Sequence, residues 1–141
     1  MIVLDTNVLS EGLRPKPSQL VIEWLLSLAD SEVFTTAVTE AEIRYGLEIL
    51  APGKKRSALA QTIRLALETE FAGRVLPFDS AAARRYGTLL AQRRRSGRAM
   101  SHADAQIAAI AQAHGARLAT RNVSDFAGCG IELINPWEHQ A

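Results

Sequence analysis

The most constraining feature of this sequence is the alternation of very short apolar segments with longer helix-forming stretches. The apolar segments predict buried strands at Ile2–Leu4, Val33–Thr35, Val75–Phe78, Arg117–Thr120 and Ile131–Ile134. Short strands that alternate with helices indicate an α/β fold, a three-layer sandwich whose central, mostly parallel sheet is covered on both faces. Such sheets bind ligands beyond the carboxyl ends of their strands, so we look for chemistry in the residues that directly follow each strand.

Helices are expected between these strands from apolar periodicity and from capping residues. They are predicted over Gln19–Ala29, from Thr36 or Thr39 to about Leu50, from Pro52-Gly53 to Phe71, from Asp79 and Ser80 to Gly97, and from Ser101 to Gly115. No repeat, low-complexity tract or linker interrupts the 141 residues. We therefore expect a single domain over residues 1–141.

Composition excludes several classes of protein. Hydrophobic residues make up 48% and charged residues 22%, a balance that indicates an ordered globular chain and not a disordered one. The single cysteine, Cys129, excludes an internal disulfide and a cysteine-based zinc site, and it suits a reducing compartment. The apolar run Ile2–Leu4 is too short for a signal peptide or a membrane span, so we expect a cytoplasmic protein.

Charge is distributed unevenly along the chain. Residues 1–50 carry a net charge of −5, residues 51–98 one of +8 and residues 99–141 one of −2. The basic part includes Arg93, Arg94, Arg95 and Arg98, in a segment without acids. A basic middle beside acidic ends indicates a polyanionic partner held near an acidic or metal site. A solvated helix face is the alternative interpretation.

Glu42 is the first acid in an unusual place. At about 100° per residue along the helix Ala37–Leu50, Glu42 falls on an apolar arc between Val38 and Ile49, apart from the other charged residues. A carboxylate on a core-facing arc must be desolvated or paired, and burying it unpaired is costly. The alternative is a capping box in which Glu42 reaches back to Thr39.

Asp104 and Asp5 also lie at positions where either a functional or a helix-capping role is possible. Asp104 lies on an alanine-rich face of the helix that Ser101 opens, and its alternative role is the third residue of that cap. Asp5 ends a buried strand, and its alternative role is the cap of a short helix that starts near Thr6.

Taken together, the three acids predict a metal site. Carboxylates that met at the strand ends without a counter-ion would repel each other. A hard divalent cation removes this repulsion, and Mg²⁺ prefers carboxylate oxygens. Such a site activates water and stabilises charge on a phosphoryl group, and the basic segment would hold the polyanionic substrate.

Two other active sites were considered. Ser101, His102 and Asp104 have the composition of a hydrolase triad, but neighbours on one helix point about 100° apart and cannot form its hydrogen-bond relay. A haloacid-dehalogenase-like phosphatase needs Asp-x-Asp after the first strand, whereas this chain has Asp5-Thr6-Asn7, without the second acid, so this class stays a weaker alternative.

Four strings follow one another along the chain: MIVLDTNVLSE, VTEAEIRYGL, SHADAQIAAIAQAHG and LATRNVSDF. In their order and spacing the sequence resembles the PIN-domain ribonucleases, and most nearly the VapC toxins of toxin–antitoxin pairs. The strings FAGRVLPFD and INPW support the FitB-like branch of these toxins. It covers essentially the whole chain. It implies Mg²⁺- or Mn²⁺-dependent endoribonuclease activity with water as nucleophile, a small DNA-binding antitoxin whose tail crosses the active-site groove, and homodimers within the toxin–antitoxin complex.

Site residues are implied by the same resemblance. It implies metal-binding acids at Asp5, Glu42 and Asp104, supporting residues Thr6 and Asn7 after the first strand, and a hydroxyl donor at Thr120. With RNA as the implied substrate and an antitoxin as the implied partner, we expect Arg93, Arg94, Arg95 and Arg98 to contact one of the two.

The fourth acid departs from the pattern of some relatives. These have an acid directly after Thr-Arg, where this chain has Asn122, with Asp125 three residues later. A short helical turn through Val123–Phe126 would bring Asp125 back toward the strand end, so we expect Asp125 and Asn122 to support the site. A non-catalytic PIN-like module that binds nucleic acid or protein is the alternative function.

Overall fold

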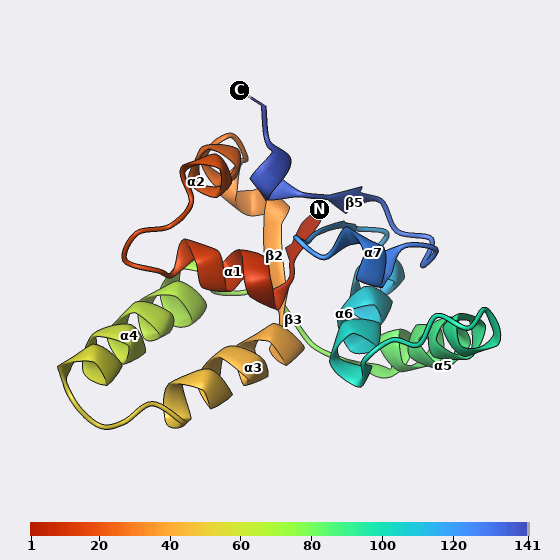
Figure 1. Ribbon diagram of the computed structural model, residues 1–141, viewed down its shortest axis with the longest axis horizontal. Helices are drawn as coiled ribbons and strands as arrows, with labels where there is room; N and C mark the ends of the chain where they lie inside the picture. The colour runs from red at the N-terminus through yellow and green to blue at the C-terminus, as the bar shows by residue number, and fades with distance from the viewer. Residues whose placement is uncertain (141) are drawn as a thin grey trace.

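A five-stranded parallel sheet forms the centre of the protein in the computed structural model, which describes residues 1–140 (Figure 1). The strands are β1 (Ile2–Leu4), β2 (Val33–Thr36), β3 (Val75–Leu76), β4 (Arg117–Ala119) and β5 (Leu133–Ile134). They lie in the order β3-β2-β1-β4-β5, and each neighbouring pair is parallel. The carboxyl ends of all these strands therefore meet at one edge of the sheet.

Helices connect the strands at the positions that the sequence predicts, with ends that differ by a few residues. They are α1 (Thr6–Gly12), α2 (Gln19–Leu26), α3 (Ala37–Glu48), α4 (Lys54–Leu65), α5 (Ser80–Arg95), α6 (His102–Ala113) and α7 (Val123–Phe126), with short helical segments η1 (Asp30–Glu32), η2 (Ala66–Glu70) and η3 (Pro136–Glu138). The η2 segment continues α4 as a π-helical turn. Among the described helices, none is long and apolar enough to cross a membrane.

Two hydrophobic cores cover the two faces of the sheet. Ile2 and Leu4 point toward a core shared with α1 to α4, whereas Val3 points toward a core shared with α5, α6 and α7. This alternation is the two-residue period of a strand, and β1 is buried throughout because it is covered on both sides. In Figure 1 the α3–α4 pair and the α5–α6 pair lie on opposite sides of the strands. The predicted three-layer α/β/α sandwich is confirmed.

Thr36, and not Thr39, caps α3. The Thr36 hydroxyl oxygen accepts the backbone N–H of Thr39 at 3.0 Å. The capping box between Thr39 and Glu42 that the sequence allowed is therefore absent, because the helix begins three residues earlier. The side chains of both residues are left to make other contacts.

Arg93 requires a correction. We expected it to contact RNA or a partner with the other arginines of its segment, but it is only 6% exposed. Its Nε donates to the carbonyl oxygen of Arg98 at 2.8 Å, and its Nη1 donates to the carbonyl oxygen of Ala127. The guanidinium therefore ties the loop after α5 to the loop after α7. The charge count could not separate it from its neighbours Arg94 and Arg95, which are exposed.

Replacing this buried arginine should cost stability. Arg93→Ala removes hydrogen bonds from a charged donor, so we expect the free energy of unfolding to fall by about 2 to 3 kcal/mol. The matched change Arg94→Ala, at an exposed position of the same helix turn, should stay within about 0.5 kcal/mol. Urea unfolding followed by circular dichroism measures both, and equal midpoints for the two variants would contradict the structural role of Arg93.

Candidate functional site

Asp5 is the first residue after β1 and is the most enclosed acid at this edge of the sheet. Its side chain is 5% exposed, and its Oδ1 accepts the backbone N–H of Val8 at 3.0 Å, which caps α1. The hydroxyl of Thr120, directly after β4, also donates to the Asp5 carboxylate. The helix cap considered from the sequence is therefore present, and it holds the carboxylate at the junction of two neighbouring strands.

The environment of Asp5 favours its neutral form. Burial raises the pKa of Asp5 above its ordinary value, and the nearby Asp104 carboxylate raises it further. Hydrogen bonds from Thr120 and from the backbone lower the pKa but do not offset the burial. An ionised Asp5 is thus a destabilised anion in the protein without a bound cation.

Glu42 reaches the same edge from α3. The Thr6 hydroxyl donates to Glu42 Oε1 at 2.6 Å, and the hydroxyls of Thr6 and Thr39 lie 3.2 Å apart. Glu42 is paired as expected, but it is exposed and not desolvated. The apolar arc of its helix is itself open to solvent, since Tyr45 is 59% and Ile49 70% exposed.

Asp104 approaches from the first turn of α6. Its backbone N–H donates to the hydroxyl of Ser101, which caps the helix at 3.1 Å. Burial raises the pKa of Asp104, and the carboxylates of Asp125 and Glu42 add to this, against the lowering by Ser101. Asp104 therefore lies within the electrostatic reach of acids from α3 and α7, as well as of Asp5.

The segment after β4 completes this edge. The Thr120 hydroxyl, fully buried, accepts the backbone N–H of Asn122 at 3.0 Å. The helical turn that we predicted over Val123–Phe126 is present as α7, and Asp125 lies in it with an exposed side chain. The Asn122 side chain is exposed and makes no cap to α7.

Four carboxylates are thus brought to one edge of the sheet by different elements. They are Asp5, Glu42, Asp104 and Asp125, and Asp104 interacts electrostatically with each of the other three. Within residues 1–140, no three His, Cys, Asp or Glu side chains lie close enough together to hold one metal ion. The carboxylates and hydroxyls at this edge offer oxygen atoms alone as ligands, which fits a hard divalent cation.

Two cavities flank α1 next to these acids. An apolar groove of about 490 Å³ lies between α1, α3 and α4, and Thr6 and Glu42 border it. A polar cleft of about 600 Å³ lies on another side of α1 and is lined by Asn7, Ser10, Glu11, Arg14, Arg121, Asn122 and Trp137. Asn7, which we expected to support the site, therefore lies in this cleft.

Sequence reasoning missed several of these residues. Thr39 was considered only as a helix cap, although its hydroxyl contacts Thr6. Glu11 and Arg14 form an ion pair at 3.2 Å, which their three-residue spacing on a helix could have indicated. Trp137 belongs to the terminal INPW string, but nothing in the sequence places it beside Arg121.

Comparison with known proteins shows what the whole chain is similar to. The sequence pattern of the PIN domain matches residues 2–127. The chain is similar to the "VapC ribonuclease Y4jK" of Sinorhizobium fredii, with 43% identity over 98% of this chain and 99% of that protein. It is similar to the "Toxin FitB" of Neisseria gonorrhoeae, with 40% identity over 97% and 99%. The solved structure "FitAB bound to IR36 DNA fragment" superimposes with a TM-score of 0.93 at 39% identity, over 100% of this chain and 99% of that one.

Neutralising Asp5 should stabilise the protein when no divalent cation is present. Because the pKa of Asp5 is raised on folding, its ionisation costs stability as the pH rises above about 3.9, and the cost is complete above its pKa in the folded protein. Asn is an equally good cap, so Asp5→Asn should melt at a higher temperature than the unchanged chain at neutral pH in EDTA. This gain should disappear below the ordinary aspartate pKa.

The control for this measurement is Asp30→Asn, at an exposed position in η1. Its melting temperature should stay close to that of the unchanged chain at every pH. If Asp5→Asn melts at a lower temperature at neutral pH, the charge of Asp5 stabilises the cap more than burial and repulsion destabilise it, and our account of the site is wrong.

Proposed function

Because the chain belongs to the PIN-domain family, in the branch of the VapC and FitB toxins, we propose that it is a metal-dependent endoribonuclease, the toxin of a toxin–antitoxin pair. The observation that carries this proposal is that four carboxylates lie at the carboxyl edge of the sheet, where Asp104 interacts electrostatically with the other three. A structural role alone would not require acids from four different elements to converge at a cost in electrostatic energy.

Asp5, Glu42 and Asp104 are the residues that would hold the metal, with Mg²⁺ as the preferred ion and Mn²⁺ as the alternative. A bound divalent cation lowers the pKa of a water ligand and stabilises negative charge on a phosphoryl oxygen. The raised pKa values of Asp5 and Asp104 imply that protons compete with the cation for these oxygens. Metal affinity should therefore increase with pH.

The remaining polar residues orient these acids. Thr120 and the Val8 N–H fix the Asp5 carboxylate, and Thr6 holds one oxygen of Glu42. The side chain of Asp125 is exposed, so its carboxylate is accessible to a metal-bound water molecule and to RNA. The amide of Asn122, which directly precedes α7, is exposed as well and is available for the same contacts.

Substrate binding requires positive charge next to this acidic edge. Arg94 and Arg95 are exposed in the last turn of α5, and Arg98 Nη2 lies 3.5 Å from the carbonyl oxygen of Ser124 in α7. We assign these three arginines to contacts with RNA phosphates or with the partner protein.

We place the activity in the cytoplasm, where RNA is present and where the thiol of Cys129 stays reduced.

The antitoxin partner is assigned to the apolar groove. The groove is bordered by Glu42 at the acidic edge and lined by apolar side chains of α3 and α4, such as Leu47 and Leu59. A partner segment in this groove would end next to the carboxylates, where an arginine could pair with them bidentately. The solved complex FitAB bound to a DNA fragment, to which this chain is similar in fold and sequence, supports a partner protein in a DNA-bound assembly. We include a homodimer of this chain in the proposal, as the resemblance to the toxin family implies.

Removing the charge of the acids should abolish RNA cleavage without unfolding the protein. Asp5→Asn, Glu42→Gln and Asp104→Asn should each reduce kcat by about 100-fold or more, because each removes a ligand of the proposed cation. Cleavage of a labelled RNA by purified protein in Mg²⁺ measures this effect, with circular dichroism to show that each variant is folded.

Chelation and a distant acid provide the controls. EDTA should abolish cleavage and added Mg²⁺ should restore it, whereas Asp30→Asn should cleave at the normal rate. RNA cleavage that persists in EDTA would exclude the metal mechanism. Binding of RNA without cleavage under any metal would favour a non-catalytic PIN-like module.

Asp125 should contribute less than the other three acids. Because Asp125 is exposed and acts from the short helix α7, Asp125→Asn should lower the rate by about tenfold and raise the Mg²⁺ concentration needed for half-maximal activity. Asn122→Ala should have a smaller effect. A metal titration of cleavage rates tests both, and an unchanged metal requirement for Asp125→Asn would restrict the site to three carboxylates.

A further inference from the structure

The polar cleft beside α1 has a chemistry that the acidic site does not explain. Asn7, Ser10, Glu11 and Arg14 line it from α1, and Arg121, Asn122 and Trp137 line it from the segments after β4 and β5. The cleft contains two guanidinium groups and a single carboxylate, so its net charge is positive. Amides, a hydroxyl and an indole ring supply the rest of its lining.

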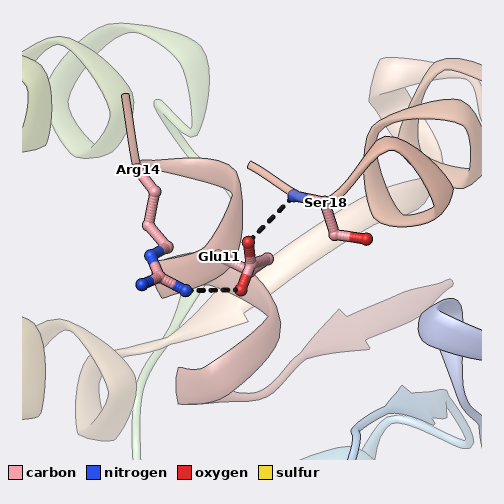
Figure 2. A network of polar contacts seen from close by, with 3 residues as sticks. All are labelled: Glu11, Arg14 and Ser18. Atoms are coloured by element: carbon pink, nitrogen blue, oxygen red, sulfur yellow. Dashed lines mark hydrogen bonds and ion pairs between the residues drawn. The ribbon is translucent and has the colours of Figure 1, made fainter. Parts of the chain in front are cut away.

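The single carboxylate of this cleft, Glu11, already has its hydrogen-bond partners within the protein. Glu11 is 8% exposed, its Oε2 accepts the backbone N–H of Ser18 at 2.9 Å, and its Oε1 accepts from Arg14 Nη1 at 3.2 Å. Figure 2 shows Glu11 between these two donors. The Arg14 side chain is 67% exposed, so its remaining N–H groups are accessible to a ligand. The ion pair with Glu11 thus orients Arg14 without covering it.

The second guanidinium is held by an aromatic ring. Arg121 lies over the ring of Trp137, with its Cζ 4.8 Å from the ring centroid. Throughout residues 1–140, no carboxylate forms an ion pair with Arg121. Stacking leaves the edge of a guanidinium available, and that edge matches the two oxygens of a phosphate.

The cleft adjoins the acidic edge directly. Asn7 is two residues from Asp5, and Asn122 bonds through its N–H to Thr120, the residue that donates to Asp5. An RNA strand bound at the carboxylates can therefore extend past Asn7 and Asn122 into the cleft.

We propose that this cleft is a nucleotide-binding subsite for the RNA strand, in which Arg121 and Arg14 bind a phosphate next to the one that is cleaved, and Trp137 contacts the nucleotide. This assignment rests on the proposed ribonuclease function and adds to it the residues that position the strand. Glu11 is a positioning residue, since it acts through Arg14.

Fluorescence of Trp137 tests the subsite without catalysis. The chain has two tryptophans, and Trp24 is 6% exposed in the core, so Trp24→Phe leaves Trp137 as the reporter. A short single-stranded oligoribonucleotide, added in EDTA at low ionic strength, should quench this signal. In the same background, Arg121→Gln should raise Kd about tenfold and make the salt dependence shallower by about one unit of log–log slope. If Trp24→Phe does not fold, the same titration in the unchanged chain serves, because buried Trp24 adds a constant signal.

Arg117→Gln is the matched control, since Arg117 begins β4 at the opposite edge of the sheet and carries the same charge. It should bind the oligoribonucleotide with unchanged Kd. Equal Kd values for the Arg121 and Arg117 variants would overturn the subsite, and so would a loss confined to antitoxin binding, which would assign the cleft to an acidic partner segment.

In Mg²⁺, Arg121→Gln should raise KM more than it lowers kcat. Absence of cleavage by the unchanged chain would overturn the ribonuclease function, while the metal-free titration would still report on the cleft.

Discussion

The buried carboxylate of Asp5 is the point at which the sheet, the first helix and the acidic edge meet. It follows the central strand β1, caps α1 through the Val8 N–H, and accepts from Thr120 at the end of the neighbouring strand. These bonds fix the anion where burial and Asp104 disfavour its charge. The protein therefore uses two donors to hold a group whose ionised form is unfavourable, which is typical of a residue kept for chemistry and not for stability.

Parallel strands account for much of what the sequence predicted. Because every strand points the same way, the residues that follow β1, β2 and β4 come to one edge, and the spacing of the strands in the sequence was enough to foresee this. The short turn Val123–Phe126 was also predicted, and it is present as α7, with Asn122 directly before it and Asp125 inside it. The apolar segments and the capping residues were enough to predict the order of strands and helices.

Side-chain environments were less predictable, because they depend on contacts between elements far apart in the chain. Glu42 was expected to be desolvated from the pattern of its own helix, yet the surface around Tyr45 and Ile49 is open. Arg93 could not be told from Arg94 by charge or position, since its burial depends on the carbonyl of Ala127, which lies 34 residues later. The pairing of Arg121 with Trp137 likewise requires the segments after two different strands to be placed first.

Thr120 gives the hydrogen bonds at this edge a fixed direction. Its fully buried hydroxyl accepts from the Asn122 N–H and donates to Asp5, and a hydroxyl has only one proton to give. The sequence of donors therefore runs one way, from the turn that carries Asp125 to the end of the central strand. The turn that carries Asp125 and the buried carboxylate of Asp5 are thus linked through a single hydroxyl.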